Sequence, residues 1–366
     1  MPAVSGGRPA RPAGRRAGRR SADANVTVAC RGGGAAGDQR AGAMALWSLE
    51  AIQGGETMLR SLEVPDEPSL ARAVTLELAD QFPPGSRIIP WRRGADFFAL
   101  RVVPPGAAAE WVLRVPLREV TTSVYDGTVD FGDVVEREAF VHGLLERQGV
   151  PVARLLGWGR ASGADDHSWM MFERVDHDDR TSLSPPALAA LGRVLRRIHA
   201  IVKTPGLEAV VGRQTAPEAM LERVQKRVSA LAERVGYPTS GELISRAQAV
   251  IGERAGLRDL RLAHMDLRPE NLCFQGDDLV AVLDLSNCTL GDPAAELGRM
   301  AAYGTLTRDL IETYADGEPL DDRLIAAYAV DTYALLGLLG AEEFADQELV
   351  NRGLQGLDDC LQRLRV

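Results

Sequence analysis

Short apolar runs, broken by glycine and proline, alternate with polar segments in the first half of the chain. The runs at 87–90, 97–103 and 111–116 follow one another closely. The segment 91–96 has the composition of a turn, and the segment 104–106 (Pro-Pro-Gly) precedes the third run. Closely spaced runs of this kind predict antiparallel strands. We therefore expect a small antiparallel sheet here.

The spacing changes to that of a helix directly after these runs. Asp133 and Glu136 have the spacing of a capping box, which predicts a helix start. Apolar residues then recur at helical intervals until Gly149, which is followed by Pro151. The apolar segment 169–172 predicts one more buried strand.

Helical spacing dominates the rest of the chain. Ser184, which is followed by proline, is typical of a helix start, and apolar residues recur at helical intervals as far as Val202. We expect two or three further helices within 215–256 and a strand–turn–strand unit at 272–284. Helices are expected from about residue 293 to the end.

These patterns predict an α+β protein with three parts. The length of 366 residues favours about two domains. Residues 44–172 are expected to form a sheet-bearing N-terminal lobe that binds a nucleotide, and residues 173–366 a mainly helical C-terminal lobe. Residues 1–43 contain almost no large apolar side chain, which predicts a disordered basic arm. An alternative is that Met44 is the true start.

Composition excludes several classes of protein. The net charge of −9 divides into +6 for residues 1–43 and −15 for the remainder, so the acidic body argues against a nucleic-acid partner. The four cysteines form no CxxC pair, which favours a reducing cytoplasm over a disulfide or zinc framework. The longest apolar stretch, 332–341, is too short to cross a bilayer, so we expect no membrane association.

The candidate chemistry lies in the segment 264–271, whose sequence is HMDLRPEN. Asp266 and Asn271 are five residues apart, and Asp284 follows Asn271 by thirteen residues. A hairpin between Asn271 and Asp284 returns the chain to its starting end, so both side chains can offer oxygen ligands to one Mg²⁺. Asp266 is then the residue that accepts the proton of an attacking hydroxyl. The alternative is a polar loop beside a hairpin.

This motif resembles the protein-kinase-like superfamily. The segment 264–271 differs from the HRDLKPEN loop of eukaryotic protein kinases only at Met265 and Arg268. However, Asp284 is followed by Leu-Ser instead of Phe-Gly, and Gly-Asp-Pro at 291–293 leaves no room for an activation segment. A long helical segment also precedes the motif. These features look like the aminoglycoside phosphotransferase family, which includes choline-kinase-like and antibiotic kinases.

The resemblance implies a bilobal protein-kinase-like fold and roles for residues of the catalytic loop. Asp266 matches the catalytic base, and Asn271 and Asp284 match the metal ligands. Arg268 lies where protein kinases carry a lysine that reaches the transferred phosphate, so it is expected to stabilise charge on that phosphate.

The resemblance also implies nucleotide-binding residues in the N-terminal lobe. Arg114 falls where the family has a phosphate-contacting lysine, and Glu138 matches its ion-pair partner, although a surface ion pair is the alternative. The backbone of Glu173 and Val175 matches the hinge that hydrogen-bonds adenine. No GxGxxG motif is present near Trp91, so the loop over the phosphates is not of the protein-kinase type. Arg93, Gly94 and Ala95 are the candidates for this loop.

The function implied is transfer of the γ-phosphate of ATP, or of GTP, to a hydroxyl of a small molecule with the help of Mg²⁺. An antibiotic is the first candidate acceptor. The alternatives are a metabolite kinase of the same fold, acting on a sugar, amino alcohol or nucleoside, and a nucleotide-binding regulator without activity. We expect a cytoplasmic monomer or homodimer with no nucleic-acid or membrane partner.

Other polar residues have simpler interpretations. His264 and His199 are expected to be structural, and Asp292 is expected to cap the helix that starts near Pro293. Between Asp309 and Glu348 the chain has eleven acidic residues and one basic residue. An acidic cleft would favour an amine-bearing acceptor, and a solvated acidic surface is the alternative.

Overall fold

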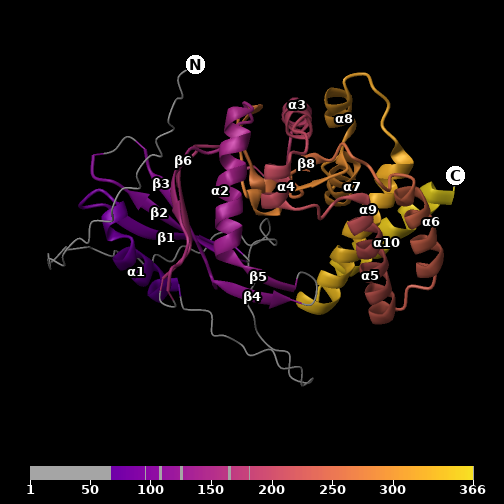
Figure 1. Ribbon diagram of the computed structural model, residues 1–366, viewed down its shortest axis with the longest axis horizontal. Helices are drawn as coiled ribbons and strands as arrows, with labels where there is room; N and C mark the ends of the chain where they lie inside the picture. Colours follow the sequence, from indigo (N-terminus) through magenta and orange to yellow (C-terminus); the bar gives the residue numbers. More distant parts are fainter. Residues whose placement is uncertain are drawn as a thin grey trace, which may run out of the picture.

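The computed structural model describes residues 67–94, 96–106, 109–123, 127–163, 166–180 and 182–365. The expectations for the arm at 1–43 and for Met44 lie outside these residues. A sheet-bearing region and a helical region follow one another along the molecule (Figure 1). The mixed α+β architecture confirms the predicted fold class.

The first region is built on a five-stranded antiparallel sheet with strand order β1-β2-β3-β7-β6. Its strands are β1 (Arg87–Arg93), β2 (Phe97–Val103), β3 (Trp111–Pro116), β6 (Leu155–Gly159) and β7 (Trp169–Glu173). The three predicted strands after the first agree with β2, β3 and β7 to within one residue. The predicted turn at 91–96 is too long, because Arg92 and Arg93 pair with Ala99 and Phe98 of β2. The sequence analysis did not predict β6.

Alternation of side chains along β2 gives the sheet its core. Phe98, Leu100 and Val102 are at most 1% exposed and point to one face. Helix α1 (Glu67–Glu77) supplies Val74, which is fully buried, to the same core. The remaining strands of this region form a separate hairpin, β4 (Val120–Ser123) and β5 (Gly127–Asp130), next to helix α2.

Helix α2 (Phe131–Arg147) begins earlier than the sequence predicted. Asp130 is its N-cap and accepts a hydrogen bond from the Asp133 amide (3.2 Å), so the expected capping box of Asp133 and Glu136 is wrong. A tertiary contact explains the earlier start. Phe131 is 5% exposed and packs edge-to-face on Phe97, which draws the first turn of the helix into the core. Asp133 instead pairs with Arg160, which directly follows β6.

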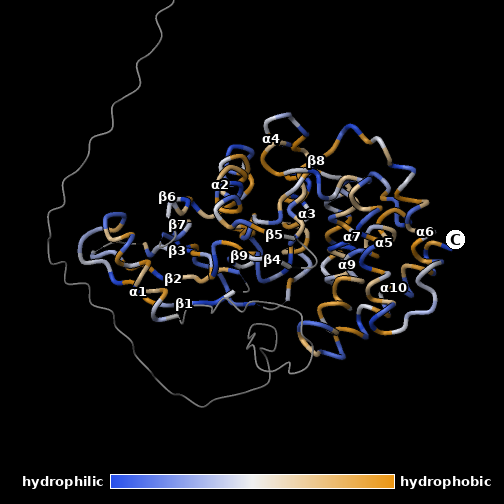
Figure 2. The backbone as a smooth tube through the Cα atoms, turned by 60° about the horizontal axis from the view of Figure 1, so that its bottom comes forward, coloured by the Kyte–Doolittle hydropathy of each residue, from blue (hydrophilic) through white to orange (hydrophobic). Residues whose placement is uncertain are grey.

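Eight α-helices form the second region in the described part of the chain after residue 184. Ser184 caps the first of them as predicted, although Val202 lies beyond its end and is 48% exposed. In Figure 2 the hydrophobic stretches of α5, α7, α9 and α10 lie together, away from β1 to β3. The helices are α3 (Pro185–His199), α4 (Pro205–Val211), α5 (Pro217–Val235), α6 (Ser240–Gly252), α7 (Pro293–Tyr303), α9 (Asp322–Leu338) and α10 (Gln347–Arg365), with the shorter α8 (Arg308–Ala315) between α7 and α9.

Helix α9 and its continuation are more apolar than the sequence analysis recognised. The helix at Asp322–Glu343 is long and apolar enough to cross a membrane by length and composition, with a mean hydropathy of 1.6 over its most apolar window. However, 78% of that window is buried inside the protein. The helix is therefore a central core element, packed between α5, α7 and α10.

Two short strand pairs connect the helical region to the site. Strand β8 (Arg261–Ala263) pairs with β11 (Thr289–Gly291), and β9 (Leu272–Gln275) pairs with β10 (Asp278–Val282). The second pair is the predicted strand–turn–strand unit. Together they hold the two ends of the segment that carries the candidate chemistry.

Candidate active site

The loop between β8 and β9 carries Asp266 and Asn271 and ties them together. The Asn271 side-chain amide donates one hydrogen bond to the Asp266 carboxylate (2.7 Å) and one to its carbonyl oxygen (2.9 Å). Both residues are buried, with Asp266 4% exposed. Met265, just before Asp266, has a φ of 65°, a conformation that is costly for a residue with a side chain and common at functional sites.

A buried carboxylate from α7 holds this loop in place. Glu296 accepts hydrogen bonds from the backbone amides of His264 (2.9 Å) and Met265 (2.7 Å). His199 of α3 bonds the same carboxylate (2.8 Å), and the Tyr314 hydroxyl bonds the other ring nitrogen of His199 (2.8 Å). Although burial disfavours its charge, the bond from His199 and the nearby histidines hold the pKa of Glu296 below its usual value. The strained loop therefore rests on an ionised group.

His264 has the structural role expected of it. Its ring bonds the Leu283 carbonyl oxygen (3.1 Å) through one nitrogen and the Asp266 amide (3.2 Å) through the other. The Leu283 amide donates to the Asn271 carbonyl oxygen (2.9 Å). These bonds bring the end of β10, and with it Asp284, beside the catalytic loop.

Asp284 begins a tight turn directly after β10. Its φ of 59° is left-handed, and the Ser286 hydroxyl donates a hydrogen bond to its carboxylate (2.7 Å). Burial alone would raise the pKa of Asp284, but Arg114 and the Ser286 hydroxyl lower it below the usual value. The group is therefore held as a carboxylate, which is the form that binds a cation.

Arg114 of β3 connects Asp284 to α2. It donates to Glu138 (2.6 Å) and lies 3.4 Å from Asp284, with its guanidinium over the Phe97 ring. Although burial disfavours the cation, the carboxylates of Glu138 and Asp284 raise the pKa of Arg114 above its usual value. Glu138 is 1% exposed, so the pair is internal, and the alternative of a surface ion pair is wrong.

The remaining candidates lie at or just beyond the ends of β7 and β1. The Glu173 amide donates to the Arg154 carbonyl oxygen (2.9 Å), and the Val175 carbonyl oxygen accepts from the His177 ring (3.0 Å). Arg93 ends β1 and Gly94 turns back onto Phe97, whereas Ala95 lies outside the described residues.

The donor set of the site suits a nucleotide with Mg²⁺. Asn271 uses its amide nitrogen for both bonds to Asp266, so its side-chain oxygen is the atom left to face a cation, together with the Asp284 carboxylate. Hard oxygen atoms are the ligands that Mg²⁺ prefers, and it usually takes only one or two carboxylates besides phosphates and water. Within the described residues no group of three or more His, Cys, Asp or Glu side chains is gathered as for an all-protein metal site.

Comparison with known proteins decides the family. A model of the phosphotransferase enzyme family matches residues 88–338. The chain belongs to this family. No curated protein shows a significant match to the chain.

Solved structures with the same fold include phosphotransferases for antibiotics. A protein of Ralstonia eutropha JMP134, assigned to the aminoglycoside phosphotransferases, is similar with a TM-score of 0.59 and 17% identity over 80% of this chain and 98% of that chain. Macrolide 2'-phosphotransferase MphH from Brachybacterium faecium is similar with a TM-score of 0.51 and 18% identity, over 78% of this chain and 96% of that chain. A thermostable mutant of aminoglycoside phosphotransferase APH(4)-Ia, in a ternary complex with ADP and hygromycin B, has a TM-score of 0.57 and 14% identity. The match covers 79% of this chain and 98% of that chain. These likenesses confirm the kinase-like fold.

In this phosphotransferase the sequence analysis missed two residues that contact the catalytic loop. Glu296 lies three residues after Pro293 of the Gly-Asp-Pro turn, and this closeness to the motif is the signal that could have found it. Arg299, one helical turn later, approaches Asp266 to 3.7 Å, and no motif marks it. The Asp292 carboxylate caps α7 by accepting from the Ala294 amide (3.0 Å), as predicted.

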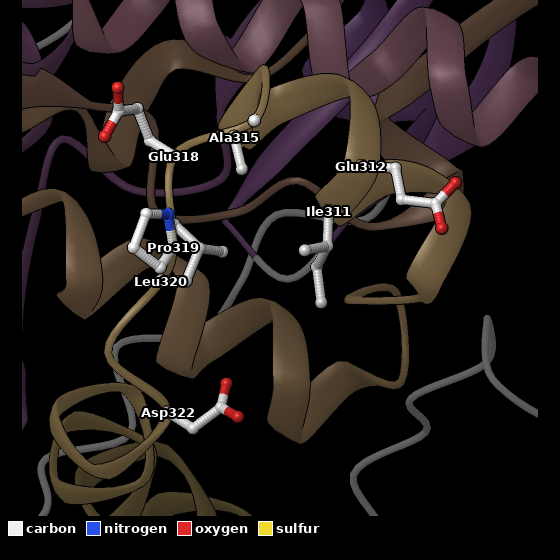
Figure 3. A pocket seen from close by; sticks show the side chains of 8 residues that line it. Ile311, Glu312, Ala315, Glu318, Pro319, Leu320 and Asp322 are labelled. Carbon is white, nitrogen blue, oxygen red and sulfur yellow. The ribbon is translucent and has the colours of Figure 1, made fainter.

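Most of the acidic residues between Asp309 and Glu348 lie on the surface of this phosphotransferase. Of the eleven between 309 and 348, ten are exposed and only Asp331 is buried. Three of them border a hollow of about 420 Å³ at the α8–α9 connection. Figure 3 shows the Glu312 and Glu318 carboxylates turned away from each other there. The hollow contains none of the candidate site residues.

Proposed function

We propose that this phosphotransferase transfers the γ-phosphate of ATP, or of GTP, to a hydroxyl group of a small molecule. The carrying observation is the direct bond between Asp266 and Asn271 beside Asp284. It gathers a proton acceptor and two cation ligands at one point, which is the set of groups that phosphoryl transfer needs. Solved structures of the same fold contain ADP with spectinomycin or with hygromycin B, and others contain GDP.

Each residue has a distinct role in the proposed reaction. Asp266 orients the acceptor hydroxyl and takes its proton as the oxygen forms a bond to the γ-phosphorus. The bond between that phosphorus and the bridging oxygen of the nucleoside diphosphate breaks, and the diphosphate leaves. Arg268, whose Nε lies 3.3 Å from Asp266, is placed to neutralise charge on the transferred group. Mg²⁺ bound at Asn271 and Asp284 supplies charge neutralisation of the phosphates.

Arg114, Glu173 and Val175 bind the nucleotide in this proposal. Arg114 bonds Glu138 through one terminal nitrogen and lies 3.4 Å from Asp284 through the other, so its charge is held beside the proposed metal ligand, where the phosphates would bind. The hinge backbone at Glu173 and Val175 reads the base. The acceptor is an antibiotic or a metabolite with a free hydroxyl.

The test is a screen of purified protein with Mg²⁺ and ATP or GTP against antibiotic and metabolite hydroxyl compounds. Products are detected as a mass gain of one phosphate, and nucleotide turnover is measured in parallel. The expected result is phosphorylation that Asp266→Ala abolishes. Absence of nucleotide turnover with every compound, and without any, would contradict the proposed function and leave the nucleotide-binding regulator.

A further inference from the structure

Helix α8 packs against α3 at a distance that only glycine permits. A Cβ atom at Gly192 of α3 would lie 2.7 Å from the Leu310 carbonyl oxygen of α8, closer than Cβ atoms come to other atoms. Figure 1 shows the two helices side by side. His199 lies seven residues after Gly192, which is about two helical turns, so both belong to the face of α3 that α8 covers.

This packing brings Tyr314, near the end of α8, onto the buried ring of His199. The Tyr314 hydroxyl lies 2.8 Å from Nδ1 of His199, and the two rings pack edge-to-face with their centroids 5.4 Å apart. Burial and the carboxylates of Glu296 and Asp292 raise the pKa of the Tyr314 hydroxyl above its usual value. The hydroxyl therefore keeps its proton and can donate it. The proposed reaction gives this hydroxyl no role.

The contact continues through one carboxylate to the catalytic loop. Glu296 is held as a carboxylate and can only accept, so Nε2 of His199, 2.8 Å away, carries the proton of their bond. In the neutral ring Nδ1 is then an acceptor, and the Tyr314 hydroxyl occupies it. The same carboxylate accepts the backbone amides of the two residues directly before Asp266, at 2.9 Å and 2.7 Å. Tyr314, His199 and Glu296 thus form a continuous set of bonds, the anchor network.

The strained backbone of Met265 makes the direction of the Glu296 carboxylate important. The φ of 65° at Met265 is unfavourable for a residue with a side chain, and such conformations persist only where the surrounding contacts impose them. If the carboxylate turns, the backbone at Met265 can relax and carry Asp266 with it. A misplacement of about 1 Å in a reacting group can cost about 10²-fold in rate.

We propose that Tyr314 is a positioning residue for the proton acceptor: its hydroxyl fixes His199, which holds Glu296 against the backbone before Asp266. This inference rests on the proposed function and adds to it a residue of α8 that no motif marks. Tyr314 acts through two other side chains and lies on neither strand that carries nucleotide-binding groups. It should therefore affect the rate of transfer, and not the binding of the nucleotide.

The direct test is Tyr314→Phe, which removes the hydroxyl and keeps the ring on His199. Titration calorimetry with ADP and Mg²⁺ gives the nucleotide affinity and the number of folded sites, and steady-state kinetics with an acceptor from the screen give kcat per site. We expect kcat to fall about tenfold with nucleotide affinity nearly unchanged. Hydrogen exchange followed by mass spectrometry needs no acceptor, and the backbone amides at 264–265 should exchange about tenfold faster in the variant.

Tyr237→Phe is the matched control for the loss of a phenol hydroxyl. Tyr237 is 8% exposed, and its hydroxyl also donates one hydrogen bond to a side chain, the Asp358 carboxylate (2.9 Å). That bond joins the segment after α5 to α10 and includes no residue of the anchor network. The control can lose stability, but its kcat per folded site and its exchange at 264–265 should equal those of the wild type.

Gly192→Ala tests the network without changing any of its members. The added methyl group would meet a backbone atom of α8, so the helix has to move away from α3 and lengthen the contact between Tyr314 and His199. We expect kcat to fall here as well. In the Tyr314→Phe background Gly192→Ala should have little further effect, because that bond is already lost. Gly241→Ala on α6 is the control, since a Cβ atom there meets nothing within 4 Å.

Two results would overturn the inference. One is that Tyr314→Phe matches Tyr237→Phe in both kcat per site and exchange at 264–265. The other is that nucleotide affinity falls as much as kcat, which would show a general loosening of the site. Either result leaves the proposed function standing. Failure of the proposed function is recognised separately, as absence of nucleotide turnover in the wild type, and the exchange comparison still decides whether the anchor network holds the loop.

Discussion

On the proposed nucleotide side of the site one arginine, Arg114, contacts two carboxylates, whereas Asp266 and Asp331 are each approached by two arginines. Arg114 contacts Glu138 and Asp284 within a buried contact between β3, α2 and the turn after β10. Within the described residues, each arrangement keeps buried polar atoms without a hydrogen-bond partner. They are the second Glu138 oxygen in the first, and the Nε atoms of Arg223, Arg268 and Arg299 and the second Asp331 oxygen in the second.

This difference shows how little the charge along the sequence says about which charged groups meet in the fold. The run of acidic residues between 309 and 348 suggests an acidic cleft, but almost all of them are exposed. The arginines that do approach Asp266 and Asp331 come from three separate segments and converge only in the fold. A high density of charge along the sequence therefore marks an exposed surface here. The charged groups near Asp266 are brought there by contacts between segments that are distant in the sequence.

The largest expected effect is at the residue where both sides meet. Asp266→Ala should reduce kcat by roughly 10²–10⁴ because the proton acceptor is lost, with nucleotide affinity nearly unchanged. The measurements are steady-state turnover and nucleotide binding. Glu270→Ala, at an exposed position of the same loop, is the control and should behave as wild type. Near-normal turnover of Asp266→Ala would remove this residue from the mechanism.

Loss of the anchor beneath the loop should affect stability. Glu296→Ala removes one partner of the buried pair with His199 and should cost about 3–5 kcal/mol of unfolding free energy. The folded pKa of Glu296 is lowered, so its ionised form stabilises the fold above its unfolded pKa, and this contribution is lost as pH falls through the folded pKa. Urea unfolding should therefore show the wild-type advantage at pH 7 and its decline in acid.

The matched control for this prediction is Glu242→Gln. Glu242 also has a lowered pKa, about 2, because of hydrogen bonds from Arg365 and Arg246, but it lies on the surface. Its replacement should change the unfolding free energy far less, since exposed ion pairs contribute little. Equal losses at Glu296 and Glu242 would contradict the anchoring role of Glu296.

Much of the fold was predictable because local pattern and tertiary environment agree. Strands β2 and β3 match their predicted bounds, and Ser184 caps α3, because alternation and capping act within a few residues. Prediction failed where a contact between residues that are distant in the sequence determines where an element begins. The start of α2 moved to Asp130 because Phe131 packs on Phe97, a contact that no local signal reveals.

The same distinction applies to the site. Asp266, Asn271 and Asp284 lie on one short segment, so their motif was visible in the sequence, and the structure brings them together. Arg299 and Asp331 are held near them only by the packing of α7 and α9. Their residue types are common on helices, so without the fold no spacing distinguishes them from surface charges.

On the nucleotide side, Asp284→Ala should weaken binding of the Mg²⁺–nucleotide complex about tenfold or more, since a charged cation ligand is lost. The measurement is ADP affinity with and without Mg²⁺, and the expected loss appears only with Mg²⁺. Asp277→Ala, in the exposed turn between β9 and β10, is the control. Full Mg²⁺-dependent affinity in Asp284→Ala would contradict the metal assignment.

Arg268 lies between the two sides and should act on the reaction more than on binding. Arg268→Ala is expected to lower kcat about tenfold while changing the KM for ATP little, because the interaction strengthens as charge develops on the transferred group. Steady-state kinetics separate the two constants, with exposed Arg258→Ala as control. If only KM changes, Arg268 is a ground-state contact of the nucleotide.

The smallest effect is expected at Arg114. Arg114→Lys keeps the positive charge but replaces a planar fork by a single ammonium, which can hold the 2.6 Å contact to Glu138 and gives up the longer one to Asp284. Nucleotide affinity should therefore change by only a few-fold, whereas Arg114→Met, which leaves Glu138 buried and unpaired, should lose roughly tenfold or more. Arg101→Lys, an exchange at a partly exposed ion pair with Glu110 on the same sheet, is the control for the substitution itself. The measurement is nucleotide affinity. Equal losses in Arg114→Lys and Arg114→Met would contradict this prediction, because they would show that nucleotide binding requires both guanidinium contacts of Arg114 and that a positive charge alone is not enough.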